Sequence, residues 1–145
     1  VCGGGCNHHQ IGLLAEATRA ALAAGNTDRA RQYAQQIGVA AAEGDGELLH
    51  LAHTLLGIVA LRSGNPDEAV TQLMRSARVP VTGRMAAEGP SMELAWMLAQ
   101  AGRREAVVQY LRACRDLWPE GTGRLQAWEA TIIAGSIPEV WPANR

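Results

Sequence analysis

The chain has 145 residues, enough for one domain with a buried core, and 48% of them are apolar. Thirteen positive charges against fourteen negative ones leave a net charge of −1. This balance argues against nucleic-acid and membrane-surface partners, because both favour proteins with a clear excess of positive charge. No apolar run approaches the roughly 18 residues of a membrane-spanning helix, so we expect no membrane insertion.

Residues 1–9 form an N-terminal segment in which two cysteines flank three glycines and two histidines follow: Cys2, Gly3, Gly4, Gly5, Cys6, His8 and His9. Cys and His are ligands suited to zinc or copper, but this spacing matches neither a haem-attachment motif nor a structural zinc site. The favoured interpretation is a disulfide, either between Cys2 and Cys6 or from one of them to a neighbouring subunit. A metal held by Cys2, Cys6, His8 and His9 is the alternative.

The sequence begins with Val1 rather than Met. We expect that an upstream segment has been removed, and a secretory signal is the commonest segment of this kind. The predicted location is therefore outside the cell or in the cell envelope, with the cytoplasm as the alternative. An oxidising compartment would also favour the disulfide.

Three glycines mark an internal repeat: Gly25, Gly64 and Gly102 lie 39 and 38 residues apart. Apolar and small residues recur at spacings of three and four on both sides of each glycine, which predicts a pair of amphipathic helices around each turn. No alternating pattern typical of strands competes. The predicted fold class is all-α, a solenoid of antiparallel helical hairpins with about three repeats and a C-terminal helix.

The second turn is the most clearly punctuated. Asn65 is suited to cap a helix, Pro66 fits its first position and Glu68 its third, so we predict a helix that begins at Pro66. A longer connection is expected over residues 79–89. The next helix is predicted to start at Pro90, because proline is tolerated in a first turn.

These residues resemble the tetratricopeptide repeat, and the middle repeat matches best through Leu56, Gly57, Gly64, Ala69, Leu73 and Ala77. The third repeat aligns through Gly102 and Ala106 but is one residue short between them, and the first is the weakest. The resemblance covers about residues 10–118 with a period longer than the family's usual 34 or so residues. The stretch from Gly89 to Trp118 also resembles bacterial tetratricopeptide proteins of unknown role. The resemblance implies a protein-interaction fold, with no enzymatic activity and no cofactor.

A further helix is predicted from about Gly123 to Ala134, which gives a helical domain of residues 10–134 and a tail of residues 135–145. We expect the ends of the stack to lack polar caps, so that copies of the chain join head to tail into a ring or a filament. The residues predicted to mediate this self-association are Cys2, Gly3, Gly4, Gly5, Cys6, Trp128, Ile132, Ile133, Val140 and Trp141.

The alternative function is an adaptor that binds a peptide of another protein. Arg103, Arg104 and Arg112 make the third repeat basic, and arginine suits bidentate binding of a carboxylate. By resemblance, some tetratricopeptide grooves bind peptide C-termini in this way. The faces of the first helix of each hairpin are rich in Ala and Leu, which favours self-association over the adaptor.

The remaining reactive side chains favour packing over chemistry. His50 and His53 lie one helical turn apart, and we expect both to pack with satisfied ring nitrogens rather than to share a ligand. Cys114 is predicted to be a buried, inert thiol. No catalytic triad or phosphate-binding loop is detectable, so the predicted protein is not an enzyme.

Overall fold

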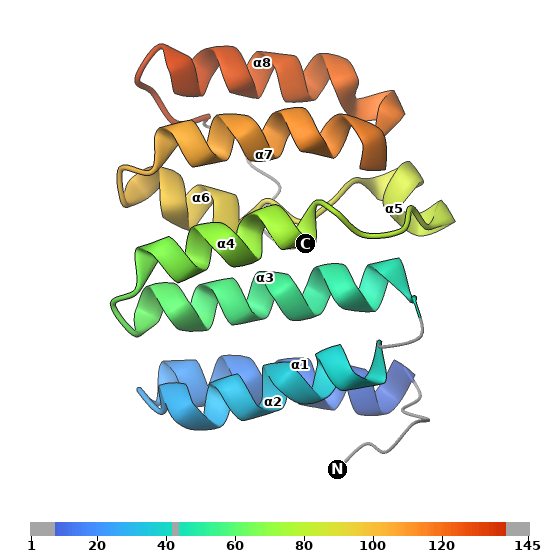
Figure 1. Cartoon of the computed structure of the whole chain (residues 1–145), viewed down its shortest axis with the longest axis vertical. Coiled ribbons are helices and arrows are strands. Elements are labelled where there is room, and N and C mark those ends of the chain that lie inside the picture. Colours follow the sequence, from blue (N-terminus) through green and yellow to red (C-terminus); the bar gives the residue numbers. More distant parts are fainter. Residues whose placement is uncertain (1–7, 42–43, 139–145) are drawn as a thin grey trace.

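The computed structural model describes residues 8–41 and 44–138, and all regular elements in these ranges are helical (Figure 1). The all-α prediction is confirmed for these residues. In chain order the elements are α1 (His8–Ala23), α2 (Thr27–Ala40), α3 (Gly46–Arg62), α4 (Pro66–Ser76), α5 (Gly83–Glu88), α6 (Glu93–Gln100), α7 (Arg104–Leu117), the 3-10 turn η1 (Pro119–Gly121) and α8 (Thr122–Ile133). Within the described ranges, none of these helices is long and apolar enough to cross a membrane.

The three repeat glycines occupy equivalent positions in three helical hairpins. Gly25, Gly64 and Gly102 have φ values of 78°, 81° and 86°, a conformation that disfavours side chains. In each turn the N–H of the following residue bonds to a carbonyl five residues earlier, as Asn65 N does to Ala60 O at 2.9 Å. This bond closes a helix whose last turn ends in a left-handed residue. The three predicted turns are confirmed, and they share one backbone geometry.

Side-chain capping fixes the start of the second helix in two of these hairpins. α4 begins at Pro66 as predicted, because Asn65 Oδ1 accepts a hydrogen bond from Glu68 N at 3.2 Å. Asn26 caps α2 in the same way, through Arg29 N at 3.1 Å.

The helices stack along the long axis of the molecule (Figure 1). α1 and α2 form one end and α8 the other, while α3 packs on both α2 and α4, and α7 packs on both α6 and α8. One hydrophobic cluster runs through the stack, from Ile11 on α1 to Ile132 on α8. The core is therefore continuous, although each layer packs mainly on its neighbours.

The third hairpin keeps the spacing of the other two, and the predicted shortfall of one residue is wrong. Ala30 and Ala69, five residues after their glycines, are fully buried, and so is Val107, five residues after Gly102. Ala106 is only half-buried. The third repeat has Val107 where the other two have Ala, so an alignment on alanine selects Ala106, which lies one residue too early.

The connection predicted over residues 79–89 contains a short helix, α5. Thr82 Oγ1 accepts a hydrogen bond from Met85 N at 3.3 Å, and Met85 is buried in the core cluster. Gly89, with a φ of 86°, ends the helix. A cap and a single buried side chain are too weak a signal to stand out in the sequence.

The helix start predicted at Pro90 is also wrong, because α6 begins at Glu93. The backbone of Ser91 is engaged elsewhere. Its N–H donates to the His50 ring at 2.8 Å, and its C=O accepts from the Tyr110 hydroxyl at 2.6 Å. These two bonds hold residues 89–92, here called the α5–α6 linker, against α3 and α7.

α8 lies close to the predicted range, but two of its apolar residues do not face solvent. Trp128 is 7% and Ile132 0% exposed, so the expectation that they form an uncovered end surface is wrong. Their spacing of four places both on the side that packs on α7. Ile133 is 64% exposed, as expected, while Val140 and Trp141 lie outside the described residues.

Candidate functional site

A groove of about 580 Å³ lies between α1, α3, α5 and the α5–α6 linker. Its apolar lining comes from Ile11, Leu48, Leu51 and Met85. Polar and charged groups complete the wall: Arg19, Asp45, Glu47, His50, Thr54, Arg84, Glu88 and Ser91. An apolar surface with a few convergent polar groups is the usual character of a binding site, so this groove is the candidate functional site.

His50 lies in the wall of the groove and connects three segments of the chain. Its Nδ1 lies 2.7 Å from Ser76 O on α4, and its Nε2 lies 2.8 Å from Ser91 N in the linker. A carbonyl can only accept and an amide N–H can only donate, so the ring is neutral with its proton on Nδ1. Burial lowers the pKa of His50 below its usual value of 6.5, against the opposing effect of the bond to Ser76.

His53 lies one turn further along α3 and bonds to a different partner. Its Nδ1 lies 2.8 Å from Gln72 Oε1, and Gln72 Nε2 donates to Glu68 Oε1 at 2.9 Å. The two rings therefore serve separate packing contacts. The prediction that these histidines pack with hydrogen-bonded rings is confirmed.

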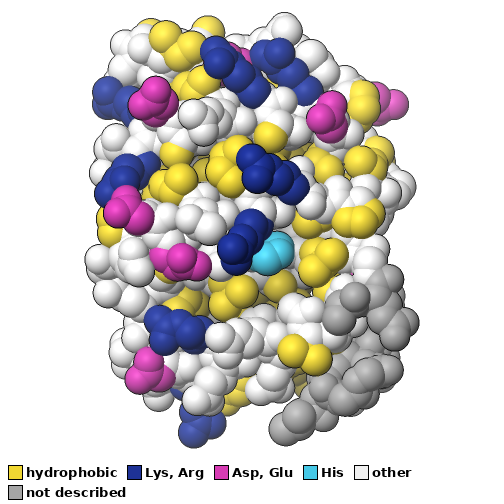
Figure 2. All heavy atoms as spheres, viewed as in Figure 1, with side chains coloured by type: hydrophobic (Ala, Val, Ile, Leu, Met, Phe, Trp, Pro, Cys, Tyr) yellow, Lys and Arg dark blue, Asp and Glu magenta, His cyan; other side chains and the backbone are white. Residues whose placement is uncertain are grey.

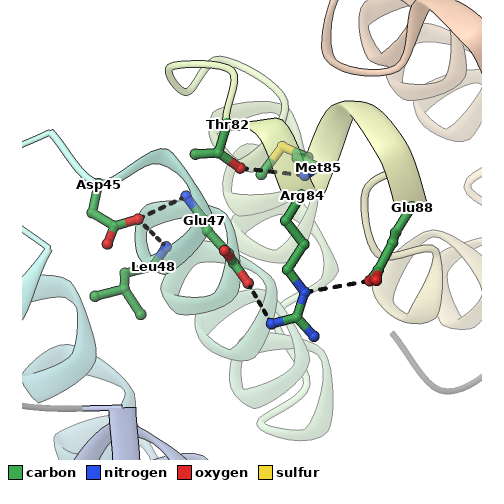
Figure 3. A network of polar contacts seen from close by, with 7 residues as sticks. All are labelled: Asp45, Glu47, Leu48, Thr82, Arg84, Met85 and Glu88. Carbon is green, nitrogen blue, oxygen red and sulfur yellow. Dashed lines mark hydrogen bonds and ion pairs between the residues drawn. The ribbon is translucent and has the colours of Figure 1, made fainter.

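At one edge of the groove, a network of polar contacts joins α5 to the start of α3 (Figure 3). The Arg84 guanidinium points between two carboxylates, with Nη1 3.2 Å from Glu47 Oε1 and Nε 3.3 Å from Glu88 Oε2. Asp45 Oδ1 accepts hydrogen bonds from the backbone of Glu47 and Leu48, which caps α3. All three charged partners of the ion pairs are exposed, so these pairs are weak and can exchange with other ions.

Arg19, which lines the groove, joins α1 to the start of α6. Its Nη1 lies 2.8 Å and 2.7 Å from the two carboxylate oxygens of Glu93. Since α1 and α6 are far apart in the sequence, this pair ties the first hairpin to the third. The positive charge of Arg19 is therefore already paired with a carboxylate of the same chain.

The three arginines predicted to clamp a carboxylate pair separately with acidic residues or face solvent. Arg103 Nη1 lies 2.7 Å from Asp67 Oδ1 on α4. Arg112 Nε lies 2.5 Å from Glu129 Oε1 on α8, so each arginine forms an ion pair with a different helix. Arg104 is exposed. None of the three lines the groove.

Cys114 is fully buried and unbridged, as predicted. Burial raises the pKa of its thiol to about 12, against the opposing effect of a hydrogen bond with the Tyr110 hydroxyl. Because the thiolate is the reactive form, this thiol is inert at neutral pH.

The predicted N-terminal cluster falls largely outside the part of the chain that the structure describes. Cys2, Gly3, Gly4, Gly5 and Cys6 are in residues 1–7, and of the two histidines only the His9 side chain is described, which is exposed. Among the described residues, no group of three or more Cys, His, Asp or Glu side chains is arranged to hold a metal ion.

No protein-family model matches the chain, and comparison with curated proteins and with solved structures found no match. On the described part of the face in Figure 2, Arg and acidic side chains are interspersed with hydrophobic ones over the whole height of the molecule. A mixed surface of this kind offers no broad basic patch to a polyanion.

Sequence reasoning missed most residues of the groove. Nothing in the sequence marks Arg19, Glu47 and Arg84 as site residues, because each is an isolated charge in its own segment. The one local signal was the spacing of four between Arg84 and Glu88, which is typical of an ion pair on a helix. The other contacts join segments that only the fold brings together.

Proposed function

We propose that this chain is a non-enzymatic protein-interaction module, a tetratricopeptide-like stack of helical hairpins, whose groove between α1, α3 and α5 binds a short segment of a partner polypeptide. The groove itself carries the proposal, because it combines apolar side chains with charged groups at its edge. The shared geometry of the turns at Gly25, Gly64 and Gly102 supports the repeat assignment.

The charges around the groove indicate the chemistry of the partner. Asp45, Glu47 and Glu88 line it, whereas Arg19 is paired with Glu93, which leaves Arg84 as the counterion for the acidic edge. The local balance is therefore negative. A fitting partner segment presents an apolar side chain to Leu48 and Leu51 and a cationic side chain to Glu47 and Glu88, where it competes with Arg84.

An array of short random peptides, probed with the labelled protein, tests this proposal. We expect the bound peptides to be enriched in an apolar residue close to Arg or Lys. The double variant Glu47→Arg, Glu88→Arg should weaken binding of the selected peptides by about tenfold, because it reverses the charge of the acidic edge. Glu105→Arg with Glu120→Arg is the matched control, since both side chains are exposed outside the groove lining.

The proposal fails if no peptide class is selected, or if the groove variant and the control variant bind the selected peptides equally well. Both variants change exposed side chains, so circular dichroism should show the same helical content in each. Enrichment of acidic peptides would contradict the inferred partner chemistry in particular.

A second candidate function is self-association of the stack through its two ends. Ile133 on α8 is 64% and Leu13 on α1 51% exposed. The helices α8 and α1 lie at opposite ends of the stack (Figure 1). Arg124 is the one charged residue among the exposed residues of α8, which include Gln126, Ala127 and Ala130. Two different ends that meet would form a heterologous contact, and such contacts produce rings or filaments. Val140, Trp141 and a bridge through Cys2 or Cys6 in an exported protein remain parts of this candidate.

A further inference from the structure

The α5–α6 linker, which forms one wall of the groove, is bonded to α3 through the neutral form of one buried side chain, His50. Ser91 N donates to His50 Nε2 at 2.8 Å, and this bond requires the lone pair of that nitrogen. His50 Nδ1 is already committed to Ser76 O at 2.7 Å. The ring therefore has no free nitrogen that could take up a proton without a change in its contacts.

Protonation of His50 would place two hydrogens in the 2.8 Å gap between Nε2 and Ser91 N, where two donors repel each other. The bond to Ser76 would survive, since Nδ1 remains a donor. The linker, not α4, is thus the contact that the charged ring displaces. Ser91 O keeps its bond from the Tyr110 hydroxyl, which would act as a pivot.

Titratable and charged groups on the neighbouring elements surround the His50 ring. On its own helix, His53 opposes a second positive charge, and Tyr110 and Cys114 on α7 have raised pKa values that keep both neutral at pH 5–8. The charged groups that line the groove are Arg19 on α1, Asp45 and Glu47 at the start of α3, and Arg84 and Glu88 on α5. Both nitrogens of the His50 ring bond to backbone groups, and neither bonds to a carboxylate.

We propose that protonation of His50 releases the α5–α6 linker from α3, so that the groove loses one of its walls and partner binding weakens when the surroundings become acidic. The release of the linker is a property of the free protein. The effect on binding rests on the proposed function of the groove.

Amide hydrogen exchange followed by NMR on the free protein tests the release. Between pH 7.5 and pH 5 we expect the protection factor of the Ser91 amide, corrected for the intrinsic pH dependence of exchange, to fall by about tenfold, the size of one lost hydrogen bond. The Ser91 amide shift should follow the same titration curve as the His50 ring protons. Backbone amides inside α7 should stay protected, which distinguishes release of the linker from unfolding.

Two variants locate the effect. His50→Gln offers an oxygen acceptor to Ser91 N and does not titrate, so protection of Ser91 should no longer depend on pH. His53→Gln, one turn away on the same helix, should respond like the wild type. If His50→Gln does not fold, the shared titration of His50 and Ser91 in the wild-type protein decides the question.

Protection of Ser91 that does not change while the His50 ring titrates would overturn the inference, as would an identical response in His50→Gln. Peptides selected on the array then test the regulatory step, with binding expected to weaken at least about threefold from pH 7.5 to pH 5. Peptide binding without pH dependence would refute the regulation alone. A pH-dependent linker in a protein that binds no peptide would refute only the function of the groove.

Discussion

Gly57 shows how a single missing side chain sets the distance between two helices. It lies on α3, and a β-carbon at this position would collide with Leu94 Cδ2 on α6. Leu94 is 1% exposed and has little room to move. Gly57 is one of the residues that carry the tetratricopeptide resemblance, and its close approach to Leu94 explains why this position needs a glycine.

Gly57→Ala should lower the free energy of unfolding by about 1 kcal/mol or more, because overpacking outweighs the gain in helix propensity. Chemical denaturation monitored by circular dichroism measures this change. Gly123→Ala is the control, since Gly123 lies on α8 with nothing within 4 Å of an added β-carbon. The control variant should be as stable as the wild type or more stable, and equal destabilisation of the two would argue against the collision.

His50 should also make the stability of the whole chain depend on pH. Its pKa in the folded state is lowered from 6.5, so the unfolded chain binds more protons just below that pH. The stabilisation by the neutral ring is therefore complete above pH 6.5 and is lost as the pH falls below 6.5. Urea denaturation at a series of pH values should show a smaller decline in His50→Gln than in His53→Gln.

At the scale of single elements, the hairpins are fixed by short-range chemistry. Each repeat glycine lets the chain reverse after one helix. In two of the three hairpins the residue after that glycine, Asn26 or Asn65, caps the following helix. These features lie within a few residues of one another. They could be predicted from the sequence because no distant contact is needed to produce them.

Gly64→Ala should lower the free energy of unfolding by about 1 kcal/mol, since alanine is disfavoured at a φ of 81°. An added β-carbon would have nothing within 4 Å, so the loss would report backbone strain alone. Gly83→Ala provides the comparison at another uncrowded glycine, one without a positive φ. A thermal melt of both variants should show a lower midpoint for Gly64→Ala only.

The short helix α5, in contrast, depends on contacts with distant parts of the chain. It has six residues, too few to be stable alone, and it is held by the burial of Met85 and by the contact of Arg84 with Glu47. Both contacts depend on distant parts of the chain. The local signals, a cap at Thr82 and the spacing of four between Arg84 and Glu88, are too weak to separate such a helix from a loop.

At the scale of the whole molecule, the stack has two unlike ends, and the packing of α8 changes which residues are available there. Burial of Trp128 and Ile132 removes two of the apolar side chains on which end-to-end association was predicted. What remains exposed on α8, besides Ile133, is Gly123, Arg124, Gln126, Ala127 and Ala130. Among the described residues, this end therefore offers fewer apolar side chains to a partner than the sequence suggested.

Ile133→Glu tests the remaining self-association. If the ends join, the wild-type protein should show a concentration-dependent rise in mass by light scattering under reducing conditions, and Ile133→Glu should remain monomeric. Val81→Glu is the control, because Val81 is an exposed aliphatic residue outside the helices. A monomeric wild type at high concentration under both reducing and non-reducing conditions would end the proposal of self-association.

By itself, the sequence determined the all-α class, the positions of the three hairpin turns, the start of α4 and the burial of Cys114 and His50. Each of these follows from residue spacing or from the conformational preference of Gly, Pro and Asn, which act over one or two helical turns.

The tertiary structure alone decided where distant segments meet. It formed the groove between α1, α3 and α5, bonded the Ser91 backbone to His50 and Tyr110, turned Trp128 inward, and paired Arg103 and Arg112 with carboxylates of other helices. The physical reason is that a helical pattern specifies which face is buried but not which neighbour covers it. That choice depends on the packing of all the layers together.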